Sequence, residues 1–132
     1  MSRFLGKVAL IVDDSPSIRR AVRAMLEKEG FAVREAGSEF GFFGSLLEYG
    51  VMADIILMDL SINEENGLEL VKKVRNTEKF RHMPIIMLTQ SSDRESVLRA
   101  RDLDVQGYIV KPVNAQQLVE RIEKALDGSA SR

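Results

Sequence analysis

The stretch Ala-Asp-Ile-Ile-Leu-Met-Asp-Leu, residues 53–60, decides the fold. Its four apolar residues, Ile55–Met58, run without a break and end at one carboxylate, Asp59. An apolar run of this length between polar residues is typical of a strand buried on both faces of a parallel sheet. Ligands in such folds bind outside the carboxyl ends of the strands. The sequence therefore places Asp59 where chemistry is expected.

Other short segments predict further strands of the same sheet. They are Val8–Val12, Phe31–Ala36, Pro84–Thr89 and Gly107–Val110. The segment Phe31–Ala36 alternates and is less apolar than the others, which is typical of an edge strand.

Helical signals lie between the strands. The first expected helix begins at Ser15-Pro16 and ends before Gly30, and the second spans Ser38–Tyr49. The third follows Gly67, the fourth spans Ser91–Leu103, and the last begins after Asn114. Strand and helix therefore alternate, which predicts an α/β fold with an open five-stranded parallel sheet and helices on both faces. We expect one domain over residues 1–127, followed by a disordered tail or the start of a linker over residues 128–132.

Composition excludes several kinds of function. Nineteen basic and 20 acidic residues give a formal charge of -1, which does not suit a nucleic-acid-binding surface. Cysteine is absent and His82 is the single histidine, so thiolate zinc sites, cysteine nucleophiles and multi-histidine metal sites are excluded. The sequence shows no signal peptide and no membrane-spanning run, so the expected location is cytoplasmic, without membrane contact.

Polar residues follow the predicted strands at the end where ligands bind. Asp13 and Asp14 follow the first strand, Asp59 ends the third, Thr89 ends the fourth and Lys111 follows the fifth. Two like charges about 4 Å apart repel by roughly 4 kcal/mol at an effective dielectric of 20, so clustered acids shift their pKa values or hold a cation. Oxygen ligands favour Mg²⁺ or Mn²⁺. Each residue alone is usually a turn or a helix cap; the joint arrangement favours phosphoryl transfer to Asp59.

The sequence resembles a receiver domain of the two-component response regulators, of the single-domain, CheY-like type. The resemblance covers nearly the whole chain. It rests on Ile11-Val12-Asp13-Asp14-Ser15, Leu57-Met58-Asp59-Leu60, Gly67, Pro84-Ile85-Ile86-Met87-Leu88-Thr89 and Gly107-Tyr108-Ile109-Val110-Lys111-Pro112. It implies a flavodoxin-like sheet with strand order 2-1-3-4-5.

The resemblance also implies roles for individual residues. Asp59 would take a phosphoryl group from a histidine kinase or a histidine phosphotransfer protein. Asp14 and Asp59 would bind Mg²⁺ directly, Asp13 through water, and Ser61 through its backbone carbonyl. Lys111 would hold the phosphate.

A conformational switch is implied in the same way. Thr89 would move its hydroxyl onto the phosphate and Tyr108 would turn inward, which changes the face formed by the fourth helix, fifth strand and last helix. A tyrosine packed at a sheet edge is the alternative for Tyr108. The protein would modify only itself and would not turn over an outside substrate. Its downstream protein target is not specified by the resemblance.

The loop after Asp59 and the residues after Thr89 depart from the family pattern. Ile62-Asn63 replaces the frequent Met-Pro pair, from which we expect an altered loop and a working site. Gln90 replaces a residue that is usually small, and we hypothesise that it slows the attack of water on the phosphate. Ser61 and Ser91 occupy positions that, by the resemblance, would flank the path of the attacking water, and their side chains are short and polar.

Three clustered phenylalanines have two interpretations. Phe40, Phe42 and Phe43 either pack into the core or form an exposed contact for a partner or a second copy of the domain.

Three arginines on the first predicted helix also have two interpretations. By the resemblance, Arg19, Arg20 and Arg23 would belong to the docking surface for a kinase or a phosphotransfer protein; the alternative is a solvated helix face with partners such as Glu27.

Other functions remain as alternatives. A phosphatase or phosphomutase with an aspartate nucleophile would carry an Asp-x-Asp pair, whereas Asp13 and Asp14 are adjacent. A cofactor-binding module of the flavodoxin kind would offer hydroxyls and amides, and not two carboxylates, to a phosphate. A degenerate receiver would act as an interaction module without phosphorylation.

Overall fold

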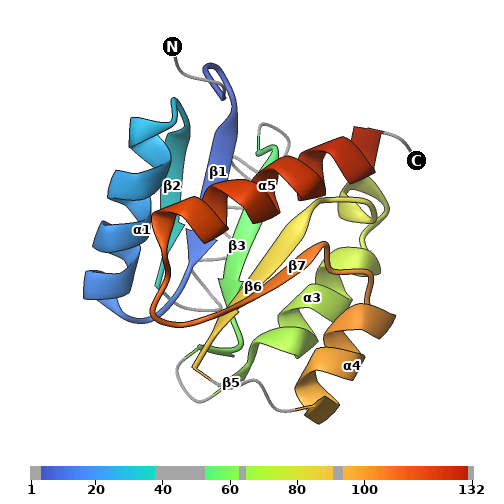
Figure 1. The fold of residues 1–132 in the computed structure, drawn as a ribbon. Helices are drawn as coiled ribbons and strands as arrows, with labels where there is room; N and C mark the ends of the chain where they lie inside the picture. Colours follow the sequence, from blue (N-terminus) through green and yellow to red (C-terminus); the bar gives the residue numbers. More distant parts are fainter. Residues whose placement is uncertain (1–3, 38–52, 63–64, 91–93, 131–132) are drawn as a thin grey trace.

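The computed structural model describes residues 4–37, 53–62, 65–90 and 94–130 (Figure 1). Five parallel strands form one sheet in the order β2-β1-β3-β6-β7. The strands are β1 (Val8–Val12), β2 (Ala32–Ala36), β3 (Ile55–Asp59), β6 (Ile85–Thr89) and β7 (Gly107–Val110). The predicted fold class and the strand order 2-1-3-4-5 are confirmed, and β2 lies at an edge as expected.

Helices cover both faces of this sheet. The helices are α1 (Pro16–Lys28), α3 (Gly67–Arg75), α4 (Arg94–Asp102) and α5 (Ala115–Ala130), with a short 3₁₀ helix, η1 (Glu78–Phe80). Figure 1 shows α1 and α5 on one face and α3 and α4 on the other. The helix predicted for Ser38–Tyr49, with Phe40, Phe42 and Phe43, lies outside the described residues.

The last helix is longer than expected. It continues to Ala130, into the segment for which the sequence predicts a disordered tail or linker. A helix that has already formed adds one backbone hydrogen bond for each further residue, which offsets the weak helix propensity of Gly128 and Ser129.

Alternating side chains of the strands divide the core into two layers. Leu10, Val12, Ile56 and Met58 pack with residues of α3, whereas the intervening residues pack with α1 and α5. Every side chain of β3 and β6 is buried, as expected for central strands with helices on both faces. Among the residues that the structure describes, no helix is both long and apolar enough to cross a bilayer.

The predicted helix signals act at both ends of α1. The Ser15 hydroxyl accepts a hydrogen bond from the Ile18 amide at 3.3 Å. At the other end, Gly30 has a φ of +100°, a left-handed conformation that costs glycine little. The amides of Gly30 and Phe31 donate to the carbonyls of Glu27 and Leu26, so the helix closes and the chain enters β2.

The segment after β3, for which the sequence predicts a loop, contains a short ladder. Ser61–Ile62 forms β4 and Glu65–Asn66 forms β5, and the two pair as a short antiparallel ladder. This ladder pairs backbone groups where the chain leaves the sheet and returns to start α3 at Gly67.

Arg75, at the end of α3, connects two other segments of the chain to this helix. Its Nε donates to the carbonyl of Leu103 at 2.8 Å, and its Nη2 donates to that of Asp104 at 3.0 Å. Its Nη1 donates to the carbonyls of Met83 at 2.8 Å and Arg81 at 3.2 Å. One guanidinium thus joins α3 to the segments that lead into β6 and β7.

We expect Arg75→Met to lower the free energy of unfolding by about 2–4 kcal/mol, because it leaves several carbonyls without a charged donor. Urea unfolding followed by circular dichroism measures the change. Lys72→Met removes the same charge from an exposed position of the same helix and should change stability by less than about 0.5 kcal/mol. Equal unfolding midpoints for the two variants would contradict the role given to Arg75.

Candidate functional site

The carboxylate of Asp13 is fixed directly after β1. The residue is fully buried at 0% exposure. Its Oδ1 accepts a hydrogen bond from the Ser15 amide at 2.9 Å, and its Oδ2 pairs with Lys111 Nζ at 2.9 Å. The neighbouring Asp14 is exposed. The first strand therefore ends in one buried and one exposed carboxylate.

Asp59 ends the central strand β3 and is 6% exposed. Its Oδ1 lies 3.5 Å from Lys111 Nζ, so the lysine is shared between two acids. Gly67 packs directly behind it: a Cβ at this position would overlap the backbone carbonyl oxygen of Asp59 and lie 3.0 Å from that of Leu60. The absence of a side chain at Gly67 thus allows α3 to begin against the backbone of Asp59.

Thr89 and Lys111 lie at the carboxyl ends of β6 and β7. Thr89 ends β6 and is 3% exposed. The Lys111 amide donates to the Thr89 carbonyl at 2.6 Å, which holds the residue after β7 against the end of β6. The Lys111-Pro112 peptide bond is cis.

These groups surround one cavity of about 580 Å³. Oxygen atoms of Asp13, Asp14 and Asp59 lie within 4.8 Å of one another. At that separation each pair of charges repels by roughly 1 kcal/mol in water and by roughly 3–4 kcal/mol at an effective dielectric of about 20. An all-oxygen donor set of this kind fits a hard divalent cation such as Mg²⁺ or Mn²⁺. The cavity is lined by Asp13, Asp14, Ser15, Ser17, Ile18, Asp59, Leu60, Thr89, Gln90 and Lys111.

The structure therefore brings together the five polar residues that the sequence places at the strand ends. Gln90 is exposed and also lines the cavity. Tyr108 lies on β7, is partly buried and packs against the core layer that contains α3. Ser61 begins β4, and Ser91 lies outside the described residues.

The sequence did not indicate the part that Arg19 plays. Its Nη1 donates to the backbone carbonyl of Asp13 at 2.7 Å, and its Nε donates to Glu35 at 3.1 Å. Arg23 pairs with Glu27, as one interpretation of the helix face suggested, and also with Glu35. Two features of the sequence could have suggested the pair of Arg19 with Glu35: Arg19 follows the two acids closely, and Glu35 lies in the predicted edge strand.

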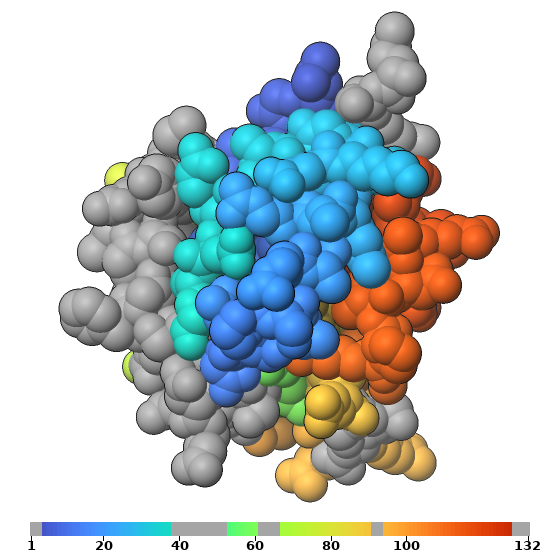
Figure 2. All heavy atoms as spheres, turned by 90° about the vertical axis from the view of Figure 1, so that its left-hand side faces the viewer, coloured from blue at the N-terminus to red at the C-terminus, as the bar shows by residue number. Residues whose placement is uncertain are grey.

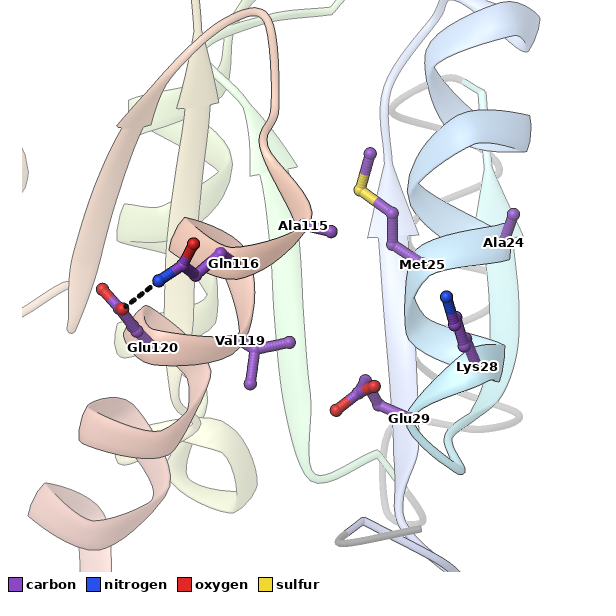
Figure 3. Close-up of a pocket in the computed structure, with 8 residues that line it drawn as sticks. All are labelled: Ala24, Met25, Lys28, Glu29, Ala115, Gln116, Val119 and Glu120. Carbon is purple, nitrogen blue, oxygen red and sulfur yellow. Dashed lines mark hydrogen bonds between the residues drawn. The ribbon is translucent and has the colours of Figure 1, made fainter. Parts of the chain in front are cut away.

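A second hollow, of about 500 Å³, lies between α1 and α5. Figure 3 shows Met25 and Val119 in its middle, with Lys28, Glu29 and Glu120 as its charged groups. Charged groups do not converge there as they do at the strand ends. The chemistry of the residues therefore favours the cavity at the strand ends as the functional site.

The family model described as "Response regulator receiver domain" matches residues 9–123 of this chain. The chain belongs to the response regulator receiver domain family. The match spans β1 to α5 and includes every residue that lines the cavity at the strand ends.

Relatives of this receiver domain carry chemotaxis names. It is 32% identical to "Chemotaxis protein CheY" of Pseudomonas aeruginosa, over 89% of this chain and 94% of the relative. It is 38% identical to "Chemotaxis protein CheY1" of Helicobacter pylori, over the same shares of the two chains. The solved structure of CheY4 of Vibrio cholerae superposes with a TM-score of 0.84 at 29% identity, covering 91% of this chain and 98% of that one. The domain is thus a signalling module of the CheY-like type.

Repulsion within the acidic cluster leads to a test on this receiver domain. Without divalent ions at low ionic strength, Asp14→Asn should unfold at a higher temperature than the wild type, because one of the clustered charges is gone. The free energy of unfolding should rise by about 1 kcal/mol. Excess MgCl₂ should stabilise the wild type more than the variant, because a bound cation needs the carboxylate. Thermal unfolding in EDTA and in MgCl₂ measures both effects. Asp102→Asn, at an exposed position on α4, is the control; equal Mg²⁺ shifts in all three proteins would contradict a site at Asp14.

Proposed function

We propose that this receiver domain accepts a phosphoryl group on Asp59 from a phosphohistidine donor and that the modification switches the face formed by α4, β7 and α5. The observation that carries the proposal is the position of the Asp59 carboxylate, 3.5 Å from the Lys111 ammonium and next to two further acids in one open cavity. A carboxylate nucleophile, a cation site and a fixed ammonium are the parts that phosphoryl transfer to an aspartate requires.

The acidic cluster would hold Mg²⁺ or Mn²⁺. In this proposal Asp14 and Asp59 are direct ligands, Asp13 acts through water and the Ser61 backbone carbonyl adds an oxygen. When bound, the cation supplies positive charge that offsets the carboxylates and the phosphoryl oxygens. The spacing of 4.8 Å or less between the carboxylate oxygens supports this assignment.

The chain's own residues would carry out the transfer. An Asp59 oxygen forms a bond to phosphorus while the bond between phosphorus and the donor imidazole breaks, and the imidazole nitrogen keeps the electron pair. The Lys111 ammonium, held at 2.9 Å by the buried Asp13, then pairs with a phosphoryl oxygen. Asp13 thus keeps the lysine in place before and after transfer. The domain catalyses only its own phosphorylation and dephosphorylation.

Thr89 and Tyr108 would convert this charge change into a change of surface. The Thr89 hydroxyl would bind the phosphoryl group and Tyr108 would turn inward behind it. The hydrogen bond from the Lys111 amide to the Thr89 carbonyl links β6 to β7 and so connects the site with the strand that carries Tyr108. Leu98 on α4 is 45% exposed and Val110 on β7 is 41% exposed, which offers a partner an apolar contact on the same face.

The expected donors are a histidine kinase or a histidine phosphotransfer protein. The printed names of the relatives direct the first search for a donor to chemotaxis-type kinases. A cytoplasmic location and the lack of nucleic-acid and membrane contacts stay predictions from the sequence.

Acetyl phosphate with MgCl₂ should produce an acid-stable, alkali-labile phosphate on the protein, as an acyl phosphate on Asp59 requires. Phosphate incorporation and intact mass measure the product. Asp59→Asn should abolish it because the amide is not a nucleophile of the same kind.

Asp54→Asn is the matched control, because Asp54 precedes the same strand at its opposite end, where its Oδ2 accepts a hydrogen bond from the Val8 amide. This variant should be phosphorylated like the wild type. Absence of phosphate on the wild type with acetyl phosphate and with a panel of phosphohistidine donors would favour the degenerate interaction module instead.

Gln90 is expected to slow hydrolysis of the phosphate because its exposed side chain lines the cavity through which water would approach. Gln90→Ala should therefore shorten the lifetime of phosphorylated Asp59, measured as loss of phosphate after the donor is removed. Gln116→Ala makes the same change on α5, outside this cavity, and should leave the lifetime unchanged. An unchanged lifetime in Gln90→Ala would remove the hypothesis.

A further inference from the structure

The peptide group between Asp13 and Asp14 is held by an arginine from α1. Arg19 Nη1 donates to the Asp13 carbonyl oxygen at 2.7 Å. The amide of Arg19 in turn donates to the Ser15 carbonyl at 3.0 Å, as part of the first turn of α1. The guanidinium therefore reaches back along its own helix to the backbone that joins two acids of the cluster.

This guanidinium is itself held by the neighbouring strand. Arg19 Nε donates to Glu35 Oε1 at 3.1 Å, while Glu35 Oε2 accepts from Arg23 Nη1 at 2.6 Å. The Glu35 carboxylate, followed by that of Glu27, raises the pKa of Arg23 above its ordinary value. Figure 2 shows α1 and β2 side by side on the surface. The ion pairs of Glu35 with Arg19 and Arg23 connect these two elements. Because the guanidinium is planar, its bond to Glu35 also fixes the direction in which Nη1 points.

Gly37 provides a separate sign that the position of Arg19 is constrained. Gly37 directly follows β2, and a Cβ at this position would lie 2.8 Å from Arg19 Nη1 and 3.3 Å from its Cζ. Any side chain at position 37 would therefore displace the guanidinium or be displaced by it.

The other groups of Asp13 are bound from different directions. Its amide donates to the Ala36 carbonyl at 3.0 Å, and its carboxylate binds the Ser15 amide and Lys111 Nζ. The contact with Arg19 adds a fixed partner for the carbonyl. The orientation of this peptide determines where the chain places Asp14, whose carboxylate faces the other two acids.

We propose that Arg19 is a positioning residue for the divalent-cation site: it fixes the Asp13–Asp14 peptide and so holds the Asp14 carboxylate where a cation can bind. This inference rests on the cation site of the proposed function. It gives Arg19 a part beyond the two interpretations of the helix face, docking or solvation. The effect opposes simple electrostatics, because a positive charge near the cluster by itself weakens cation binding.

The opposing signs allow a sharp test by Mn²⁺ titration, with bound and free ion separated by electron paramagnetic resonance. Arg19→Gln and Arg23→Gln each remove one positive charge and one contact with Glu35, but only the first removes the bond to Asp13. Arg19→Gln should weaken Mn²⁺ binding about tenfold, as loss of a group that orients metal ligands does. Arg23→Gln should bind as tightly as the wild type or slightly more tightly. Equal or tighter binding by Arg19→Gln than by Arg23→Gln would overturn the proposal.

Two further variants separate position from charge and from folding. Arg19→Lys keeps the charge but cannot bond Glu35 and the Asp13 carbonyl in the same fork geometry, so it should also lose affinity. Gly37→Ala leaves every charge in place and should lower affinity by displacing the guanidinium. Thermal unfolding in EDTA identifies any variant that has lost its fold. Wild-type affinity in both folded variants would contradict the positioning role.

Amide hydrogen exchange at Asp14 and Ser15, measured without divalent ions, tests the same inference apart from the cation. Arg19→Gln should speed exchange at these amides relative to Arg23→Gln, because the peptide has lost its fixed partner. If the wild type binds no Mn²⁺, the proposed cation site fails whatever the exchange shows. If the wild type binds Mn²⁺ but exchange and affinity are the same in the two variants, only the role of Arg19 fails.

Discussion

Three carboxylates lie close together at the carboxyl ends of the strands, where the Lys111 ammonium pairs with two of them, and the geometry of the site depends on this concentration of negative charge. Asp13 is fully buried and pairs with Lys111, while Asp14 and Asp59 complete the cluster. The folded chain thus places like charges close together, an arrangement that costs stability unless another positive group joins them. This loss of stability is what a site for the proposed cation and phosphoryl group would cost the domain.

The parallel sheet makes this concentration of charge possible. Lys111 and Asp13 are 98 positions apart in sequence, and the parallel strands that precede them bring both residues to the carboxyl ends of the sheet. At the amino ends of the strands, side chains pair with the backbone instead: the Asp54 and Gln106 side chains accept hydrogen bonds from the amides of Val8 and Ile85. Hydrogen bonds stabilise the sheet at the amino ends of its strands, whereas like charges are gathered at the carboxyl ends. The contacts that stabilise the sheet and the residues of the candidate site therefore lie at opposite ends of the strands.

The sequence predicted the fold and the polar groups at the strand ends because both follow from simple local patterns. Unbroken apolar runs mark buried strands, and the residue that ends such a run, Asp59 or Thr89, must lie at the carboxyl edge. The contacts of Arg19 and Arg75 could not be predicted in this way, since each guanidinium binds backbone carbonyls, and a carbonyl leaves no mark in the sequence. The β4–β5 ladder was missed for a related reason, because two-residue strands are too short to show a period.

Gly67 illustrates a position whose importance does not come from chemistry of its own. Any larger residue there would meet the backbone of Asp59 and Leu60 at the end of β3, so every replacement displaces either the start of α3 or Asp59. In a saturation mutagenesis screen scored by signalling output, this glycine would rank with the acids although it has no reactive group. Such a screen reports both the residues that react and those that leave room for them, and the coordinates are needed to tell the two apart.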